Sequence, residues 1–170
     1  MSFIRTKKIK GKKYAYIVEN KWKKKKVKQR FKKYLGRVYE FKREEKDFEE
    51  FISVGLEEYR NTRKINDIIL DLAEWEVLNH GFEKKDNVYV NGECAVNLKK
   101  KQVVNTRNSN VSLAFNEGML NEYAIKKLLR LRFKGEDEEE DAYLLAKSFV
   151  ESGIKVPKQI FVEVFSKLYK

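Results

Sequence analysis

The sequence contains very little cysteine, histidine or proline, with one residue of each among 170. A single cysteine, Cys94, excludes an internal disulfide bond and fits a reducing compartment. One cysteine and one histidine also exclude a zinc site of the usual Cys/His kind. No apolar run is long enough to span a bilayer, and the first residues lack the hydrophobic segment of a signal peptide. We therefore expect a soluble, cytoplasmic protein that uses no cofactor or metal.

The few residues with catalytic potential have ordinary structural explanations. The one histidine, His80, precedes Gly81 at the predicted end of a helix, where a cation is mildly favoured. Asp67 and Asp71 share a helix face with Glu74 nearby, a spacing that would suit a divalent metal in a nuclease or transfer enzyme. Acids on an amphipathic helix more often form its solvated face. The sequence therefore predicts a protein that is not an enzyme.

Positive charge is abundant, and it is distributed unevenly. The net charge is +12. Residues 1–44 hold 18 basic and 3 acidic residues, a net charge of +15, whereas residues 45–170 hold 20 basic and 23 acidic residues, a net charge of −3. Such asymmetry indicates a nucleic acid or an anionic membrane surface as the partner. Thermophilic proteins are also rich in Lys and Glu, but that enrichment would spread over the whole chain. We therefore favour nucleic acid.

The basic segment has the alternation of β-strands. Residues alternate from Phe3 to Ile9 and from Tyr14 to Val18, on either side of a turn at Gly11, which predicts a β-hairpin. Glu19-Asn20 is a second turn signal. The next run, Trp22 to Leu35, fits a strand or a helix. We favour a strand, because a lone hairpin is only marginally stable and a third strand completes a meander.

The third run would carry an almost wholly cationic face if it is a strand. That face would comprise Trp22, Lys24, Lys26, Lys28, Arg30, Lys32 and Tyr34. Like charges repel, so such a face does not stabilise the fold, but it can bind a polyanion. A solvated lysine-rich edge that discourages aggregation is the alternative explanation.

We predict that lysines and Arg30 contact phosphates while the aromatic residues stack or wedge against bases. The candidate nucleic-acid-binding residues are Lys12, Lys13, Tyr14, Tyr16, Trp22, Lys23, Lys24, Lys25, Lys26, Lys28, Arg30, Lys32, Lys33 and Tyr34. Contacts of this kind give affinity and salt dependence but little sequence readout. The cluster Lys99-Lys100-Lys101 with Arg107 is either a second contact or a solvated hairpin end.

The remainder of the chain predicts an α+β body. One amphipathic helix is predicted from Phe48 to Tyr59, with Gly55 on its apolar stripe at a point of close packing. A second helix runs from Lys64 to Asn79 and ends at Gly81. Asn91-Gly92 lies between two alternating runs and predicts another hairpin. A further short strand is expected over residues 111–115.

The last third of the sequence predicts three helices, which span roughly residues 120–134, 136–152 and 157–168. The acidic run Glu136–Asp141 is typical of a helix N-terminus and is a poor chelator, because successive side chains point in different directions. The last two helices could form a helix-turn-helix, but the outward residues of the final helix are too weakly cationic for a recognition helix. The predicted fold class is α+β, with a basic meander module at 1–44 and a body at 45–170, or one compact domain overall.

Residues 3–36, about a fifth of the chain, resemble the basic β-hairpin leader of DDE-class insertion-sequence transposases. The leader carries a GK-x-Y-x-Y-hydrophobic pattern and an x-Q-R-x-x-K-Y-L-G ending. The matching residues are Phe3, Ile4, Arg5, Gly11, Lys12, Tyr14, Tyr16, Val18, Gln29, Arg30, Lys33, Tyr34, Leu35 and Gly36. The resemblance implies a DNA-associated hairpin. It does not extend to the catalytic carboxylates, which have no counterpart here. The rest of the chain resembles a small archaeal protein, and few Gln residues with many Lys and Glu are typical of a thermophile.

Two functions remain in view. The first is non-enzymatic nucleic-acid binding through the basic meander, with DNA preferred to RNA because of the resemblance. The second is a protein-interaction or assembly module, in which the body binds a protein partner or a second copy and the basic arm docks on an acidic surface.

Overall fold

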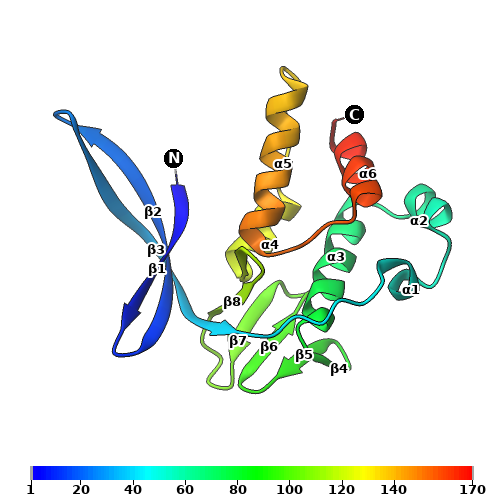
Figure 1. Cartoon of the computed structure of the whole chain (residues 1–170), viewed down its shortest axis with the longest axis horizontal. Helices are drawn as coiled ribbons and strands as arrows, with labels where there is room; N and C mark the ends of the chain where they lie inside the picture. Colours follow the sequence, from blue (N-terminus) through cyan, green and yellow to red (C-terminus); the bar gives the residue numbers. More distant parts are fainter. Residues whose placement is uncertain (1, 170) are drawn as a thin grey trace.

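The computed structural model describes residues 2–169 and confirms a mixed α+β fold of two sheets with helices beside them (Figure 1). The strands are β1 (Ser2–Ile9), β2 (Lys12–Lys23), β3 (Lys26–Glu40), β4 (Glu83–Lys85), β5 (Val88–Asn91), β6 (Cys94–Asn97), β7 (Gln102–Asn105), β8 (Val111–Phe115) and β9 (Gly118–Leu120). The helices are α1 (Phe48–Ile52), α2 (Leu56–Thr62), α3 (Ile65–Asn79), α4 (Glu122–Leu129), α5 (Glu138–Ser152) and α6 (Lys158–Tyr169). All six are too short or too polar to cross a lipid bilayer within the described part of the chain.

The N-terminal strands form the predicted antiparallel meander and are also joined to the body. The larger sheet has the order β1-β2-β3-β8-β9. Residues Arg37–Glu40, at the end of β3, pair in parallel with Val111–Ala114 of β8. The ambiguous third run is thus a strand. Its last residues belong to a sheet that includes the body, which sequence periodicity did not predict.

The position of the second turn was predicted wrongly. Glu19 and Asn20 lie inside β2, opposite Arg30 and Gln29. The chain turns instead at Lys24-Lys25, whose φ angles are 48° and 60°. A two-residue turn with both φ angles positive matches the twist of the flanking strands. Continuous pairing of β2 with β3 therefore prevails over the local turn preference of Asn20, and Trp22 belongs to β2 rather than to the third strand.

Gly36 allows the meander to approach the body closely. Its φ is +91°, and a Cβ atom there would lie 2.0 Å from the carbonyl oxygen of Asn110. The Ser112 hydroxyl donates a hydrogen bond of 2.8 Å to the carbonyl oxygen of Leu35, beside this contact. Ala15, Ile17, Leu35 and Val38 form a small second core at this root.

The predicted helix from Phe48 to Tyr59 is wrong, because two short helices occupy this segment. Ser53 ends α1 in a left-handed conformation, and Gly55 precedes α2 with open space around the position of its missing Cβ. In one straight helix, Phe48 and Tyr59 would be about 16 Å apart along the axis. The bend brings their ring centroids to 5.8 Å, so both rings enter the core. Gly55 therefore marks a bend and not close packing.

The other predicted elements of the body are confirmed. Helix α3 crosses the core, and Gly81 follows its end with a φ of +79°. The hairpin at Asn91-Gly92 forms part of the smaller sheet, whose order is β4-β5-β6-β7. Strands β4, β7 and β9 were not predicted, because each has only three or four residues and shows no useful alternation. The three predicted C-terminal helices are present, but α4 ends at Leu129 and not near Lys134 as predicted.

Candidate nucleic-acid interface

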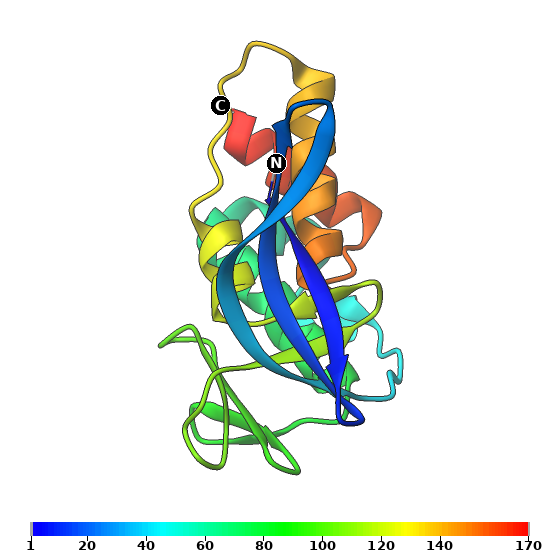
Figure 2. The same cartoon turned by 90° about the vertical axis from the view of Figure 1, so that its left-hand side faces the viewer.

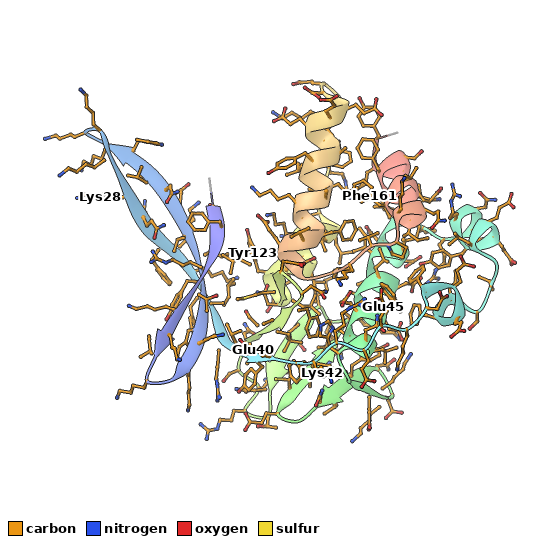
Figure 3. All side chains as sticks on the ribbon, in the orientation of Figure 1. Lys28, Glu40, Lys42, Glu45, Tyr123 and Phe161 are labelled. Carbon is orange, nitrogen blue, oxygen red and sulfur yellow. The ribbon has the colours of Figure 1, made fainter. Side chains whose placement is uncertain are left out.

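The outer part of the β2–β3 hairpin projects away from the body as a two-stranded ribbon. We call the segment Glu19–Arg30 the outer arm. Every residue from Asn20 to Tyr34 is exposed. The ribbon stands apart from α5 in Figure 1, and Figure 2 shows it in front of the helices. Lys28 lies on this outer part, far from the body, whereas Tyr123 lies near the root (Figure 3). The outer arm is therefore free to meet a large partner.

One face of the outer arm is cationic. Residues directly opposite each other in an antiparallel pair share a face, and alternate residues along a strand do the same. The pairs Lys23–Lys26, Lys21–Lys28 and Glu19–Arg30 therefore lie together. Two of these pairs oppose like charges, which destabilises a hairpin. An arrangement that opposes folding in this way is suited to a polyanion.

The turn adds two lysines at the tip of the cationic face. Lys24 and Lys25 both occupy left-handed conformations, which disfavour side chains other than those of Gly, Asn and Asp. Residues 20–29 include six lysines and no acidic residue. The tip is thus the point of densest positive charge in the chain.

The opposite face of the arm is mainly aromatic and apolar, but it is interrupted by the polar pair Asn20–Gln29, and Gln29 accepts a hydrogen bond from Arg5. Trp22 pairs with Val27 and Val18 with Phe31, and Tyr16 faces Tyr34 nearer the root. The exposed fractions are 79% for Trp22, 58% for Phe31, 49% for Tyr34 and 48% for Val27. Tyr16 lies with its ring centroid 5.7 Å from Phe31 and 5.4 Å from Tyr34. The aromatic rings on this face are therefore accessible to a partner.

The predicted grouping of the side chains on the third run is therefore partly wrong. Lys26, Lys28 and Arg30 share a face as expected, but Trp22 and Tyr34 lie on the other one. The turn at Lys24-Lys25 places Trp22 on β2. Two bulges in β3 then change the alternation, because Leu35 and Lys32 have no partner on β2. Ala15 and Tyr16 pair with Gly36 and Tyr34, and Ile17 and Val18 pair with Lys33 and Phe31. Bulges of this kind are not visible in a periodic pattern.

Other candidate residues lie farther from the tip. Lys12 and Lys13 begin β2 at the opposite end of the meander, and Lys13 forms an ion pair with Glu40. Lys32 lies 3.3 Å from Glu19, and its hydrogen bond lowers the pKa of that carboxyl group. Lys33 lies opposite Ile17. These cations extend the basic surface, but the structure does not bring them together with the tip lysines.

Lys21, Val27 and Phe31 lie on the two faces described above and were absent from the predicted set. Lys21 faces Lys28, and Phe31 is the second most exposed of the four apolar residues on the aromatic face. A turn placed between Lys23 and Lys26 would have identified Lys21, because the pairing follows directly from the turn position.

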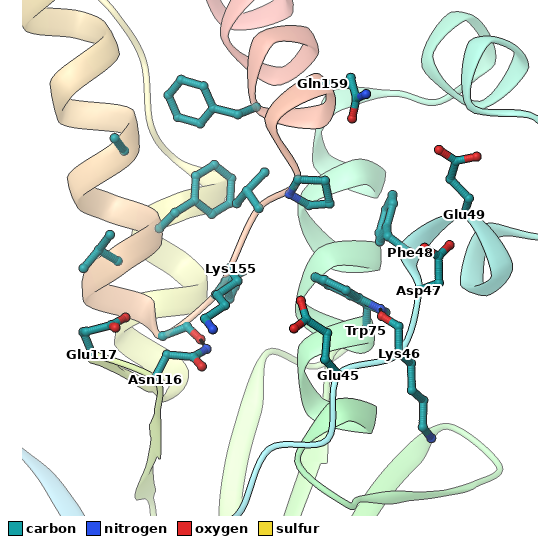
Figure 4. Close-up of a pocket in the computed structure, with 18 of the residues that line it drawn as sticks. Glu45, Lys46, Asp47, Phe48, Glu49, Trp75, Asn116, Glu117, Lys155 and Gln159 are labelled. Atoms are coloured by element: carbon teal, nitrogen blue, oxygen red, sulfur yellow. Dashed lines mark hydrogen bonds between the residues drawn. The ribbon is translucent and has the colours of Figure 1, made fainter.

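A second candidate region is a pocket of about 740 Å³ between the α1 segment and the adjoining ends of α5 and α6 (Figure 4). Its floor is apolar and includes Phe48, Trp75 and Phe149. Four acidic and two basic side chains line it, among them Glu45 and Lys155, but none of its described lining residues is His, Cys, Ser, Thr or Tyr. The pocket suits an apolar group beside a positive charge.

Asp71 and Glu74, two of the three acids that could have formed a metal site, are engaged with other side chains. Asp71 accepts hydrogen bonds from the guanidinium of Arg63 at 2.7 Å and from the hydroxyl of Tyr59 at 2.8 Å. Glu74 pairs with Lys84 at 3.2 Å. Over residues 2–169 there is no group of three or more His, Cys, Asp or Glu side chains placed to hold a metal ion.

His80 is a core residue in a buried polar network. Its ring stacks on Phe115 with centroids 3.8 Å apart, and burial lowers its pKa. The carboxylate of Glu76 accepts hydrogen bonds from Arg43 Nε at 2.8 Å, from Asn116 Nδ2 at 2.9 Å and from the Lys155 amide at 3.0 Å. His80 thus follows the end of α3, as predicted, but its ring is buried and not solvated.

These local features are the basis for any functional argument, because no protein-family model, curated protein or solved structure matches the chain.

Proposed function

We infer that the chain is a non-enzymatic nucleic-acid-binding protein that contacts phosphates through the outer arm. The observation that supports this function best is the unneutralised lysine cluster at an exposed tip, where like charges face each other across the strands. Lysines that neutralise phosphates release condensed counterions, a gain that is absent in the free protein. The neighbouring aromatic rings supply surfaces on which bases can stack.

DNA is the preferred polymer within this proposal. The resemblance of residues 3–36 to a transposase leader supports DNA. Groove dimensions support it as well, because the B-DNA major groove admits a two-stranded β-ribbon, whereas the A-form RNA major groove is too narrow for side chains to read.

A salt titration of affinity tests the proposal. The protein is titrated against a duplex DNA of arbitrary sequence and against a structured RNA at several salt concentrations. We expect affinity to fall steeply with salt, with a slope of about −0.9 per phosphate neutralised on duplex DNA. Absence of binding to both polymers at moderate salt would overturn the proposal.

A matched pair of variants locates the site. The first replaces Lys24, Lys25 and Lys26 by alanine, and the second replaces Lys99, Lys100 and Lys101. Both remove three positive charges, but only the first removes them from the tip. We expect a weaker affinity and a shallower salt slope for the first variant, with near wild-type behaviour for the second. Equal losses would indicate that net charge, and not the arm, governs binding.

The pocket supports a second candidate function, a protein-interaction module. An apolar floor with an excess of acids at its rim fits an apolar side chain beside a basic one on a protein partner, while the arm steers the chain towards an acidic surface. Binding to an acidic protein without binding to nucleic acid would favour this function. Val150, which lines the pocket and is 52% exposed, is the position to test, because Val150→Glu would block the pocket without disturbing the core.

A further inference from the structure

The two faces of the outer arm differ in chemistry, and a single flat ligand does not satisfy both. Lys21, Lys23, Lys26 and Lys28 lie on one side of the ribbon, and Trp22 and Val27 lie on the other. The side chains of successive residues stand on opposite faces of a strand, so the ribbon separates its cations from its rings.

A fully paired duplex would engage only one of these faces. Its phosphates can meet the lysines, but its bases are stacked within the helix and cannot cover Trp22, which remains 79% exposed. A lone single strand has the opposite limitation. If its bases stack on the rings, its phosphates lie away from the lysine face.

A junction between paired and unpaired strands presents both chemistries at once. The ribbon can enter between the two diverging strands, where one strand offers its phosphates and the other its unpaired bases. The tip favours this entry, because Lys24 and Lys25 form a tight two-residue turn and Trp22 lies two residues before it. A base that stacks on an aromatic side chain contributes enough affinity to discriminate between substrates.

We propose that the outer arm is a wedge that binds forked nucleic acid, with the lysine face against the phosphates of one strand and Trp22 stacked on an unpaired base of the other. This inference rests on the proposed nucleic-acid function and narrows its substrate to junctions. Phe31 and Tyr34 continue the stacking surface towards the root, where Val18 and Tyr16 face them across the ribbon.

The test compares three DNA ligands with equal numbers of phosphates: a blunt duplex, a single strand and a fork whose arms are not complementary. The full chain is used at one salt concentration. We expect the fork to bind at least about fivefold more tightly than the blunt duplex, the lower limit for one stacked base. Quenching of tryptophan fluorescence should accompany binding of the fork.

Two variants test which face of the outer arm gives the preference for forked over blunt DNA. Trp22→Ala should lower affinity for the fork by a larger factor than affinity for the blunt duplex, and Trp22→Phe should restore part of the difference. The double variant Lys21→Ala/Lys28→Ala should weaken binding to the fork and to the blunt duplex by similar factors. Circular dichroism should match the wild type in each case, because these side chains are all exposed.

The outcomes separate the inference from the function on which it rests. Equal affinity of the wild-type protein for fork and blunt duplex would overturn the wedge and leave nucleic-acid binding intact. A Trp22→Ala variant that loses affinity equally for all three ligands would also overturn it. Failure of the wild type to bind any of the three would overturn the proposed function itself.

Discussion

Glu76 holds together four segments that are distant in sequence. Its carboxylate is fully buried and contacts Arg43, Asn116 and the amide of Lys155. Removing it would leave Arg43 without its buried partner. We expect Glu76→Ala to lower the free energy of unfolding by about 3 kcal/mol or more in urea denaturation, as for other broken buried ion pairs. The exposed Glu139→Ala is the control and should unfold like the wild type. A small effect at Glu76 would show that water replaces the carboxylate.

The burial of His80 gives stability a dependence on pH. Its pKa is lowered in the folded state, chiefly by burial, so the unfolded chain binds the proton more readily. The stabilising contribution of the neutral ring is therefore fully present above the unfolded pKa of about 6.5 and is lost as pH falls through the lower folded pKa. We expect a His80→Phe variant to lose less stability than the wild type between pH 7 and pH 5 in urea denaturation. Parallel losses in both proteins would contradict this role.

At the scale of the elements, the arm combines an unfavourable tip with a well-anchored root. Lys24 and Lys25 occupy conformations that Asn-Gly adopts more easily. Replacing them by Asn-Gly should stabilise the hairpin by about 1 kcal/mol. Amide hydrogen exchange should then slow by about fivefold in the outer arm and remain unchanged at β8. Unaltered exchange in the arm would show that the Lys24-Lys25 turn does not destabilise the hairpin.

Gly36 fixes the root of the arm on the body. A methyl group there would collide with the backbone of Asn110, and its φ of +91° is itself unfavourable for alanine. We expect Gly36→Ala to lower the free energy of unfolding by about 2 kcal/mol or more. Gly55→Ala is the matched control, because Gly55 has open space and a φ of −59°. The measurement is a comparison of the melting temperatures of the two variants. Similar melting temperatures would argue against the close contact between Gly36 and Asn110.

At the scale of the whole molecule, the outer arm adds charge without contributing to either core. The cores include no residue between Asn20 and Gln29. Joining Glu19 to Arg30 through Asn-Gly would remove six lysines and lower the net charge from +12 to +6. We expect this shortened chain to melt within about 2 °C of the wild type, as for changes remote from a core. Its nucleic-acid binding should be lost in the salt titration, and retained binding would place the site elsewhere.

The sequence was most informative where structure depends on neighbouring residues. The turn at Gly11, the hairpin at Asn91-Gly92 and the last three helices follow from local periodicity and turn chemistry. The errors involve distant partners. The bend at Ser53 brings Phe48 and Tyr59 into one core, and no local signal specifies that core. The cationic character of the arm was visible in composition, whereas the separation of lysines from rings depends on a register that bulges have shifted.

The parallel pairing of β3 with β8 has a consequence for biosynthesis. Residues 37–40 pair with residues 111–114, so the root of the arm cannot close until its partner has been translated. At typical elongation rates this delay lasts about 4–15 s. The hairpins of the meander form within microseconds of emerging from the ribosome, since their contacts are local. A cationic ribbon with exposed aromatic rings is therefore formed beside ribosomal RNA before the body that anchors it has been synthesised.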